Sequence, residues 1–181
     1  MSKILISGYY GFANAGDEAM LTAIIESLRQ VEKNVELTVL SGNPEDTAAK
    51  HQVCSVYRFN PLGIIQAMKD SELIISGGGS LLQDVTSKRS LLYYLSIIGL
   101  GKFFGKKVML FAQGIGPIRA KWARKLTSLV CNEADLITVR DSESAAELIE
   151  MGVKPEKITV TADSVLSLNP VTKECGQYLL Q

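Results

Sequence analysis

Two patterns of apolar positions follow one another along the chain. Short, nearly continuous apolar runs bounded by glycine or polar residues predict buried strands, and apolar residues spaced three and four apart predict helices with one apolar face. The predicted strands are Ile4–Ser7, Val35–Leu40, Cys54–Tyr57, Leu73–Ser76, Val108–Phe111, Leu136–Val139 and Ile158–Val160. The predicted helices are Glu18–Gln30, Leu62–Lys69, Leu91–Phe104, Trp122–Ala134 and Ser142–Met151.

This alternation of strands and helices is typical of a parallel sheet with helices on both faces. The last predicted helix is clearly bounded, because Asp141 can cap its start, Gly152 follows its end and Pro155 prevents its continuation. We therefore predict an α/β, Rossmann-like domain over residues 1–168. Residues 169–181 show no clear periodicity, and we predict a linker or a truncated tail there.

The helix predicted over Leu91–Phe104 is apolar on nearly every side. A helix without a polar face is normally buried, so we favour a place in the core or in an interface between subunits. A helix lying in a membrane surface is the alternative, because the basic residues that flank the segment suit an anionic headgroup layer; they are Lys88 and Arg89 before it and Lys102, Lys106 and Lys107 after it. The longest uncharged stretch, residues 90–101, has 12 residues, against the ~20 that span a bilayer.

Composition narrows the classes of function. The 181 residues are 46% apolar, with a mean hydropathy of +0.15, which is enough for a core and excludes a disordered chain. Basic and acidic residues number 19 each, so no net positive charge favours nucleic acid. Three scattered cysteines and one histidine, His51, which we place at the surface, form neither a disulfide framework nor a metal site. The chain opens without a signal-peptide pattern, and we expect a cytoplasmic protein.

Three glycine-rich turns follow predicted strands. They read GYYGFANAGDE over Gly8–Glu18, GGGSLLQD over Gly77–Asp84 and AQGIGP over Ala112–Pro117. In an open parallel sheet, ligands bind outside the carboxyl ends of the strands, where these turns meet. Glycine lets a ligand approach backbone N–H groups, which can hold an anion. Any one of these turns could be only a tight connection, but three at one edge of the sheet favour a pocket.

The common nucleotide motifs are absent. Gly8, Gly11 and Gly16 do not have the G-x-G-x-x-G spacing, and no acidic residue ends the second predicted strand. Residues 101–107 have the wrong spacing for a phosphate-binding P-loop, and Lys107 stands where Ser or Thr is required. Neither NAD nor Walker-type ATP binding is therefore supported.

Polar residues in and after the turns are the candidates for chemistry. We interpret Asp17 first as the cap of the helix beginning at Glu18. A carboxylate at Asp84 could bind sugar hydroxyls or act as an acid or base. Arg140 precedes a helix and suits a carboxylate or phosphate, with a structural ion pair as the alternative. The candidate binding residues are Asn14, Asp17, Glu18, Gly77, Gly78, Gly79, Gln83, Asp84, Gln113, Gly114 and Arg140.

The three turns, together with VRDSES over Val139–Ser144 and TADSVL over Thr161–Leu166, resemble the polysaccharide pyruvyl transferase family. The resemblance runs from the first predicted strand to about Leu168, nearly the whole chain. It implies transfer of a pyruvyl group from phosphoenolpyruvate to two hydroxyls of a sugar, which forms a cyclic ketal. In the bacterial cell-wall members the sugar is N-acetylmannosamine on a lipid-linked precursor. No further cofactor and no metal are implied.

The resemblance also implies a second domain. Members of the family have a two-domain architecture like that of GT-B glycosyltransferases, with the active site between the domains and a catalytic histidine in the second one. No residue here takes that role, so this chain resembles the N-terminal domain and is expected to be inactive alone. Expected partners are the sugar acceptor and the missing C-terminal domain. A homo-oligomer and peripheral contact with the inner face of the membrane remain open.

Within that resemblance, Arg140 suits the anionic donor, and Asn14, Gln83 and Asp84 are candidates for binding hydroxyls. Two alternatives of different classes stay open. One is a GT-B glycosyltransferase domain that uses a nucleotide sugar, since the architecture is shared. The other is a non-catalytic domain that binds glycan.

Overall fold

The computed structural model describes residues 2–85 and 87–168. In this part of the chain, seven parallel strands form one sheet in the order β3-β2-β1-β4-β5-β6-β7. The strands are β1 (Lys3–Tyr10), β2 (Glu36–Ser41), β3 (Cys54–Tyr57), β4 (Leu73–Gly77), β5 (Lys107–Gln113), β6 (Leu136–Val139) and β7 (Ile158–Val160). The predicted fold class is confirmed.

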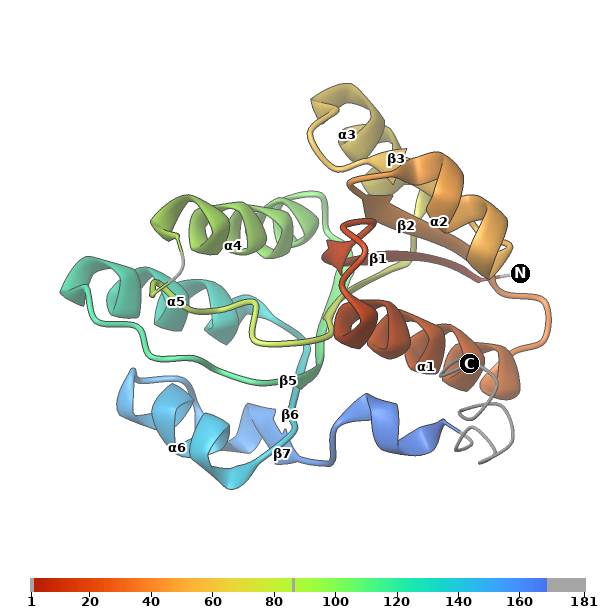
Figure 1. Ribbon diagram of the computed structural model, residues 1–181. Helices are drawn as coiled ribbons and strands as arrows, with labels where there is room; N and C mark the ends of the chain where they lie inside the picture. Colours follow the sequence, from red (N-terminus) through yellow and green to blue (C-terminus); the bar gives the residue numbers. More distant parts are fainter. Residues whose placement is uncertain (1, 86, 169–181) are drawn as a thin grey trace.

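Helices cover both faces of the sheet (Figure 1). They are α1 (Ala15–Val31), α2 (Pro44–His51), α3 (Pro61–Asp70), α4 (Lys88–Phe103), α5 (Lys121–Glu133) and α6 (Ser142–Glu150), with the short 3-10 helices η1 (Pro155–Lys157) and η2 (Ser164–Ser167). Buried residues of α1 form one core cluster with β1, β2 and β4. Those of α3, α4, α5 and α6 form a second, larger cluster.

The strand order creates a switch point between β1 and β4. The chain passes from β1 outward to β2 and β3, and then returns to place β4 on the other side of β1. Because crossover connections are right-handed, the helices before and after this reversal lie on opposite faces of the sheet. The turns after β1 and β4 therefore leave the sheet in opposite directions and open a crevice at its carboxyl edge.

Two predictions at the N-terminal side are corrected. The first helix begins at Ala15 rather than at Glu18, because the Asn14 side chain caps it and accepts hydrogen bonds from the N–H groups of Gly16 and Asp17. Asp17 is thus not the cap. Helix α2 has no counterpart in the prediction, since its only buried residue is Thr47 and it has no apolar face to detect. The tail predicted over 169–181 lies outside the described residues.

Helix α4 is buried on one face only. Leu91, Leu95 and Ile98 pack into the larger core cluster, as predicted. The outer face is also apolar, with Leu92 exposed to 42% and Phe103 to 80%. None of the helices in the described ranges is long and apolar enough to cross a membrane.

Candidate functional site

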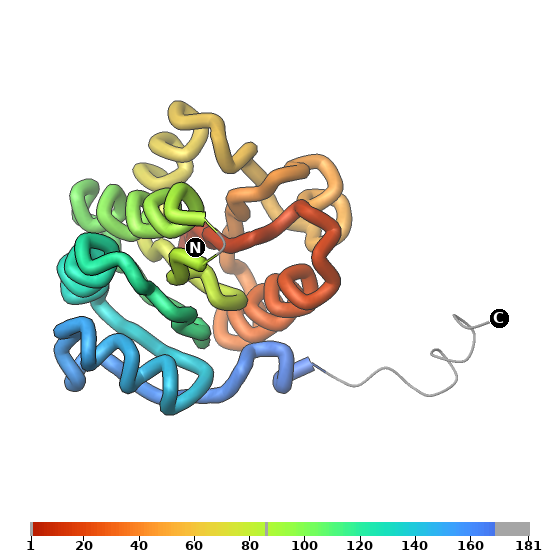
Figure 2. Tube along the Cα trace, turned by 60° about the vertical axis from the view of Figure 1, so that its left-hand side comes forward, coloured from red at the N-terminus to blue at the C-terminus, as the bar shows by residue number. Residues whose placement is uncertain are grey.

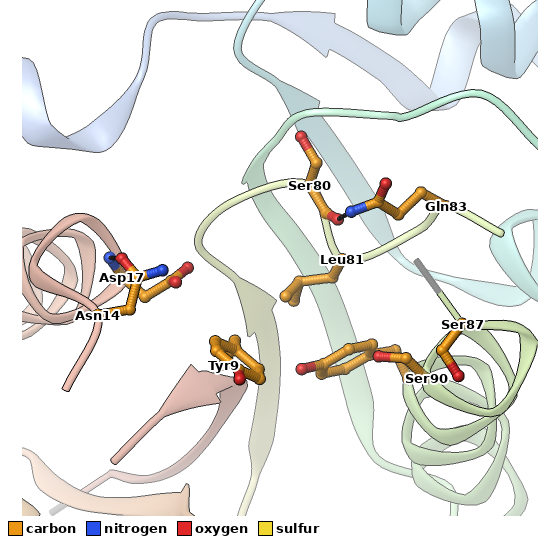
Figure 3. A pocket seen from close by; sticks show the side chains of 9 residues that line it. Tyr9, Asn14, Asp17, Ser80, Leu81, Gln83, Ser87 and Ser90 are labelled. Carbon is orange, nitrogen blue, oxygen red and sulfur yellow. Dashed lines mark hydrogen bonds between the residues drawn. The ribbon is translucent and has the colours of Figure 1, made fainter. Parts of the chain in front are cut away.

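A cavity of about 380 Å³ lies at the carboxyl edge of the sheet, at the switch point between β1 and β4. Its walls come from the turn after β1, the turn after β4 and the first turns of α4 (Figure 3). The lining residues are Tyr9, Asn14, Asp17, Ser80, Leu81, Gln83, Ser87, Ser90 and Tyr94. Three of them, Asn14, Asp17 and Gln83, belong to the candidates predicted from the sequence.

Asp17 is the only carboxylate in this lining. Since Asn14 caps α1, the Asp17 side chain is left to reach into the cavity, where Figure 3 shows its carboxylate opposite Leu81. Burial, and then the neighbouring charge of Glu18, raise the pKa of Asp17. Within the described ranges its carboxylate accepts no hydrogen bond. A partly desolvated carboxylate of raised pKa is suited to exchange a proton with a bound hydroxyl.

The glycines after β4 pack the turn rather than line the cavity. Gly78 and Gly79 have φ of +85° and +73°, a region that favours glycine. A Cβ on Gly78 would come within 2.7 Å of the Tyr10 hydroxyl, which donates to the carbonyl of Gly77 at 2.5 Å. The N–H of Gly79 points at the sulfur of Met20, 2.9 Å away. These backbone groups fix the turn so that the following Ser80 and Leu81 reach the cavity.

Arg140 lies beside the cavity. It is not part of the lining itself, but its guanidinium contacts the lining residue Ser80. It contacts the carboxylate of Asp163 at 3.3 Å, that of Asp141 at 3.4 Å, and the hydroxyl of Ser80 at 3.4 Å. Gly114 lies beneath it, and a Cβ there would come 2.8 Å from Arg140 Cζ. The absence of a side chain at Gly114 therefore makes room for the guanidinium. Both the ion pair and the anion site considered above fit this geometry, because Ser80 joins Arg140 to the cavity.

Asp84 has a different role from the one we considered. Its carboxylate accepts hydrogen bonds from the N–H groups of Arg119 at 3.0 Å and Ala120 at 2.9 Å, and so fixes the entry to α5. These bonds lower the pKa of Asp84, which keeps the group ionised. It lies outside the cavity lining. An ionised carboxylate held by two amides is poorly suited to donate a proton.

Glu18 and Gln113 are also engaged in the fold. Glu18 accepts the N–H of Gly11 at 2.8 Å and lies 3.4 Å from His51. The His51 side chain is only 10% exposed, so its predicted place at the surface is wrong. Gln113 is fully buried and donates to the hydroxyl of Ser76 at 3.1 Å. Neither Glu18 nor Gln113 reaches the cavity.

Arg58 is the residue at this edge that sequence reasoning missed. It is 4% exposed and its Cζ lies 4.4 Å from the ring centre of Tyr93. Its Nη2 donates to the hydroxyl of the cavity residue Tyr94 at 3.4 Å, whereas Nε and Nη1 have no partner in residues 2–85 and 87–168. The rings around it come from the turns after β1 and β3 and from α4; they are Tyr9, Phe12, Phe59, Tyr93 and Tyr94. The only signal in the sequence is its place between Tyr57 and Phe59.

No three His, Cys, Asp or Glu side chains in the part of the chain that the structure describes are grouped closely enough to hold a metal ion. Two arginines, Arg58 and Arg140, lie close to the cavity. The two arginines flank the cavity from opposite sides: Arg58 contacts its Tyr94 wall and Arg140 its Ser80 wall.

Several solved structures share this fold. The structure of Anabaena HepE in complex with UDP and glucose matches with a TM-score of 0.61 and 14% identity, over 90% of this chain and 44% of that protein. A glycosyltransferase from Rickettsia africae matches with 0.57 and 11%, over 89% and 42%. UDP-GlcNAc 2-epimerase from Neisseria meningitidis bound to UDP-GlcNAc matches with 0.54 and 15%, over 92% and 47%. The chain thus has the fold of one domain of GT-B proteins and spans about half the length of these structures.

Comparison with curated proteins gave no match. A sequence profile of polysaccharide pyruvyl transferases, however, matches residues 14–174, which include the cavity side chains Asn14 and Asp17, the turn after β4 and Arg140. The match covers most of the chain and agrees with the resemblance of the glycine-rich turns. The chain belongs to the polysaccharide pyruvyl transferase family.

Proposed function

We propose that this chain is the N-terminal domain of an enzyme that transfers a pyruvyl group from phosphoenolpyruvate to two hydroxyls of a sugar, as a cyclic ketal. The observation that carries the proposal is the cavity at the switch point, within the region that matches the family. Its lining combines hydroxyls, amides, two tyrosine rings and a single carboxylate, which are groups that bind sugars. The proposed acceptor is an N-acetylmannosamine residue of a cell-wall polysaccharide precursor.

The reaction sets clear demands on the site. A proton added to C3 of phosphoenolpyruvate leaves a cation at C2, and the first sugar hydroxyl attacks C2 and loses its proton. The C–O bond to phosphate then breaks, phosphate leaves with its electron pair, and the second hydroxyl closes the ketal and loses its proton. The enzyme must therefore hold two anionic groups, orient two hydroxyls and handle three protons.

The cavity residues suit the hydroxyl side of this reaction. Asp17, with its raised pKa, would take the proton of an attacking hydroxyl. Asn14 and the hydroxyls of Ser87 and Ser90 would orient the sugar. Gln83, whose amide donates to the carbonyl of Ser80 at 3.1 Å, would accept a sugar hydroxyl through its side-chain oxygen.

Arg140 suits the anionic donor. Its guanidinium is about a third exposed, and it shares Ser80 with the cavity. A phosphate or carboxylate bound there would compete with Asp163 for the guanidinium. Donation of the proton to C3 is assigned to the second domain, because Asp84 is held ionised and the only histidine, His51, is engaged with Glu18.

The test compares Arg140→Ala with Asp163→Asn in an enzyme that contains both domains. Loss of the charge-assisted contact to the donor predicts an affinity for phosphoenolpyruvate at least about tenfold lower in Arg140→Ala, equivalent to ~1.5–3 kcal/mol. Asp163→Asn removes the ion pair with Asp163 but keeps the cation and its contact with Asp141, so we expect donor affinity to be retained. If Arg140→Ala changes thermal stability but neither KM nor kcat, Arg140 is a structural residue and the donor site lies elsewhere.

A nucleotide-sugar glycosyltransferase is the second candidate, favoured by the UDP and UDP-sugar complexes among the structures of similar fold. Titration of the two-domain enzyme with phosphoenolpyruvate and with UDP-N-acetylglucosamine separates the two candidates. Binding of phosphoenolpyruvate, with release of phosphate when a sugar acceptor is added, supports pyruvyl transfer. Binding of the UDP-sugar alone would replace that proposal.

A further inference from the structure

Charge is distributed very unevenly along this neutral chain. Residues 88–125 contain nine Lys and Arg and no Asp or Glu, although the chain has 19 of each kind. The remaining residues therefore have ten basic and 19 acidic side chains. The basic segment includes α4, β5 and the first turns of α5, and β5 lies inside the sheet. Apart from Lys107, the exposed first residue of β5, the cations of this segment belong to the two helices and to the turns beside them.

Five of these cations gather where α4 and α5 begin. These five are Lys88, Arg89, Arg119, Lys121 and Lys125. Within the described ranges, none of them has a carboxylate within ion-pair distance. Lys88 and Arg119 line one shallow depression together with Asp84, whose carboxylate is taken by backbone amides. Neither helix has an acidic residue in its first turn, so the two helix dipoles add to the positive potential.

Large apolar side chains are exposed along both helices, from the start of α5 to the last residue of α4. Trp122 of α5 is 47% exposed, and Phe103 of α4 is 80% exposed. Leu92, Leu100 and Leu129 are exposed on the same two helices. The helices α4 and α5 lie side by side on one face of the sheet (Figure 2) and bury their inner sides in one core cluster. Their outer sides form one surface, the α4–α5 face.

We propose that the α4–α5 face docks the protein on the surface of an anionic phospholipid bilayer. The five cations at one end of the face, and a tryptophan, leucines and a phenylalanine exposed along it, match a layer of anionic headgroups above acyl chains. A purely electrostatic partner such as a nucleic acid would leave the leucines and Phe103 unmatched. The inner side of α4 is buried in the core, as the sequence predicted. In this proposal its outer side lies at the membrane surface, which is the alternative that the sequence also offered.

The proposal also places the cavity relative to the membrane. Ser87 and Ser90, at the start of α4, line the cavity, while Lys88 and Arg89 between them are exposed. A docked α4 would therefore hold the cavity mouth beside the headgroups. Membrane docking does not depend on the reaction carried out there, so it is tested without any substrate.

Trp122 is the only tryptophan, which makes it a direct probe of the face. The chain is mixed with vesicles of phosphatidylcholine alone or of phosphatidylcholine with phosphatidylglycerol, and flotation and tryptophan emission are measured. We expect flotation and a blue shift of the emission with the anionic vesicles only, both weakened by added salt. Absence of flotation with the anionic vesicles, or equal flotation with both kinds, overturns the proposal.

Two matched pairs of variants test whether binding depends on the α4–α5 face itself or only on the net charge and exposed apolar surface of the whole protein. Arg89→Glu with Lys125→Glu should weaken partitioning roughly 30-fold, whereas Lys33→Glu with Lys154→Glu, which changes the net charge equally outside the face, should weaken it much less. Phe103→Ser should reduce binding, whereas Leu166→Ser, at a similarly exposed residue of η2, should not.

Circular dichroism confirms that each variant is folded. Equal losses in a variant and its control would refute docking through this face. The other possible partner of this face is a second copy of the chain, and analytical ultracentrifugation tests for it. A dimer that Phe103→Ser abolishes would assign the face to that second copy and would refute the membrane proposal.

Discussion

Arg58 is a buried cation that faces aromatic rings instead of a carboxylate. Removing a guanidinium from water costs several kcal/mol, and a lone buried charge normally needs a counter-ion. Here five aromatic rings within 4.4–5.9 Å of its Cζ supply the compensation through their negative faces. Because the one side-chain hydrogen bond of Arg58 within the described ranges goes to Tyr94, Arg58 holds a cavity wall in place and leaves the phenolic O–H of Tyr94 to donate elsewhere.

Replacing Arg58 tests whether its charge or its volume stabilises the fold. Arg58→Met keeps most of the volume and removes both the desolvation cost and the cation–π contacts, so we expect the free energy of unfolding to change by about 1 kcal/mol or less. Arg58→Ala leaves a cavity among the rings and should cost ~2–5 kcal/mol. Urea denaturation of both variants measures the difference. Equal losses in both would mean that the cation itself stabilises the fold.

Asp17 combines a proposed role in the site with a cost in stability. Its pKa is raised in the folded protein, so its stabilising contribution is complete below the unfolded pKa and is lost as pH rises through the folded pKa. We therefore expect Asp17→Asn to melt higher than the parent at neutral pH and to lose this advantage under acidic conditions. In the two-domain enzyme the same change should lower kcat by about 10²–10⁴-fold. A variant with unchanged kcat would remove Asp17 from the proposed mechanism.

At the scale of elements, the turn after β4 is held by close packing that only glycine permits. Gly78→Ala places a methyl group in a left-handed backbone and within 2.7 Å of the Tyr10 hydroxyl, so we expect a loss of at least ~1–2 kcal/mol. Gly99→Ala is the control, because Gly99 lies inside α4 with no atom near the added carbon. Alanine there should stabilise by about 0.8–1 kcal/mol. Thermal melts of both variants give the comparison, and a neutral Gly78→Ala would contradict this account of the turn.

The strands could be predicted from the sequence because each is a short, mostly apolar run, and all but the edge strands β3 and β7 are largely buried in the parallel sheet. Helix α2 could not, since an eight-residue helix whose only buried residue is Thr47 has no apolar period. The start of α1 depended on which of two suitable residues, Asn14 or Asp17, caps the helix, and the sequence offers both.

The candidate site was predicted in outline only. The turns after β1 and β4 do meet, because their strands are neighbours in the sheet, and they bring Asn14, Asp17 and Gln83 together. Asp84, a candidate from the sequence, lies outside the cavity lining, whereas Arg58, which the sequence did not suggest, contacts the cavity residue Tyr94. The carboxylate of Asp84 meets backbone amides 35 residues away, and Arg58 meets rings from segments far apart in the chain. Contacts of such long range leave no local pattern.

At the scale of the whole molecule, the fold is self-contained but the site is open. Two core clusters, one on each face of the sheet, bury the inner sides of the helices. The cavity, in contrast, is open at the carboxyl edge of the sheet, and the chain spans about half the length of the structures that share its fold. We therefore expect the chain to unfold in one cooperative transition and to release no phosphate from phosphoenolpyruvate in the presence of a sugar acceptor.

A calorimetric melt and a phosphate-release assay measure the two halves of this expectation independently. A single transition whose calorimetric and van't Hoff enthalpies agree would establish that the domain folds alone. Adding the second domain in trans should then restore turnover, because it supplies the proton donor assigned to it. The matched control is the Asp17→Asn chain with the same second domain, which should stay close to inactive. Turnover by the isolated chain would show that its own residues protonate C3, and would return Asp17, whose raised pKa suits an acid, to consideration as that donor.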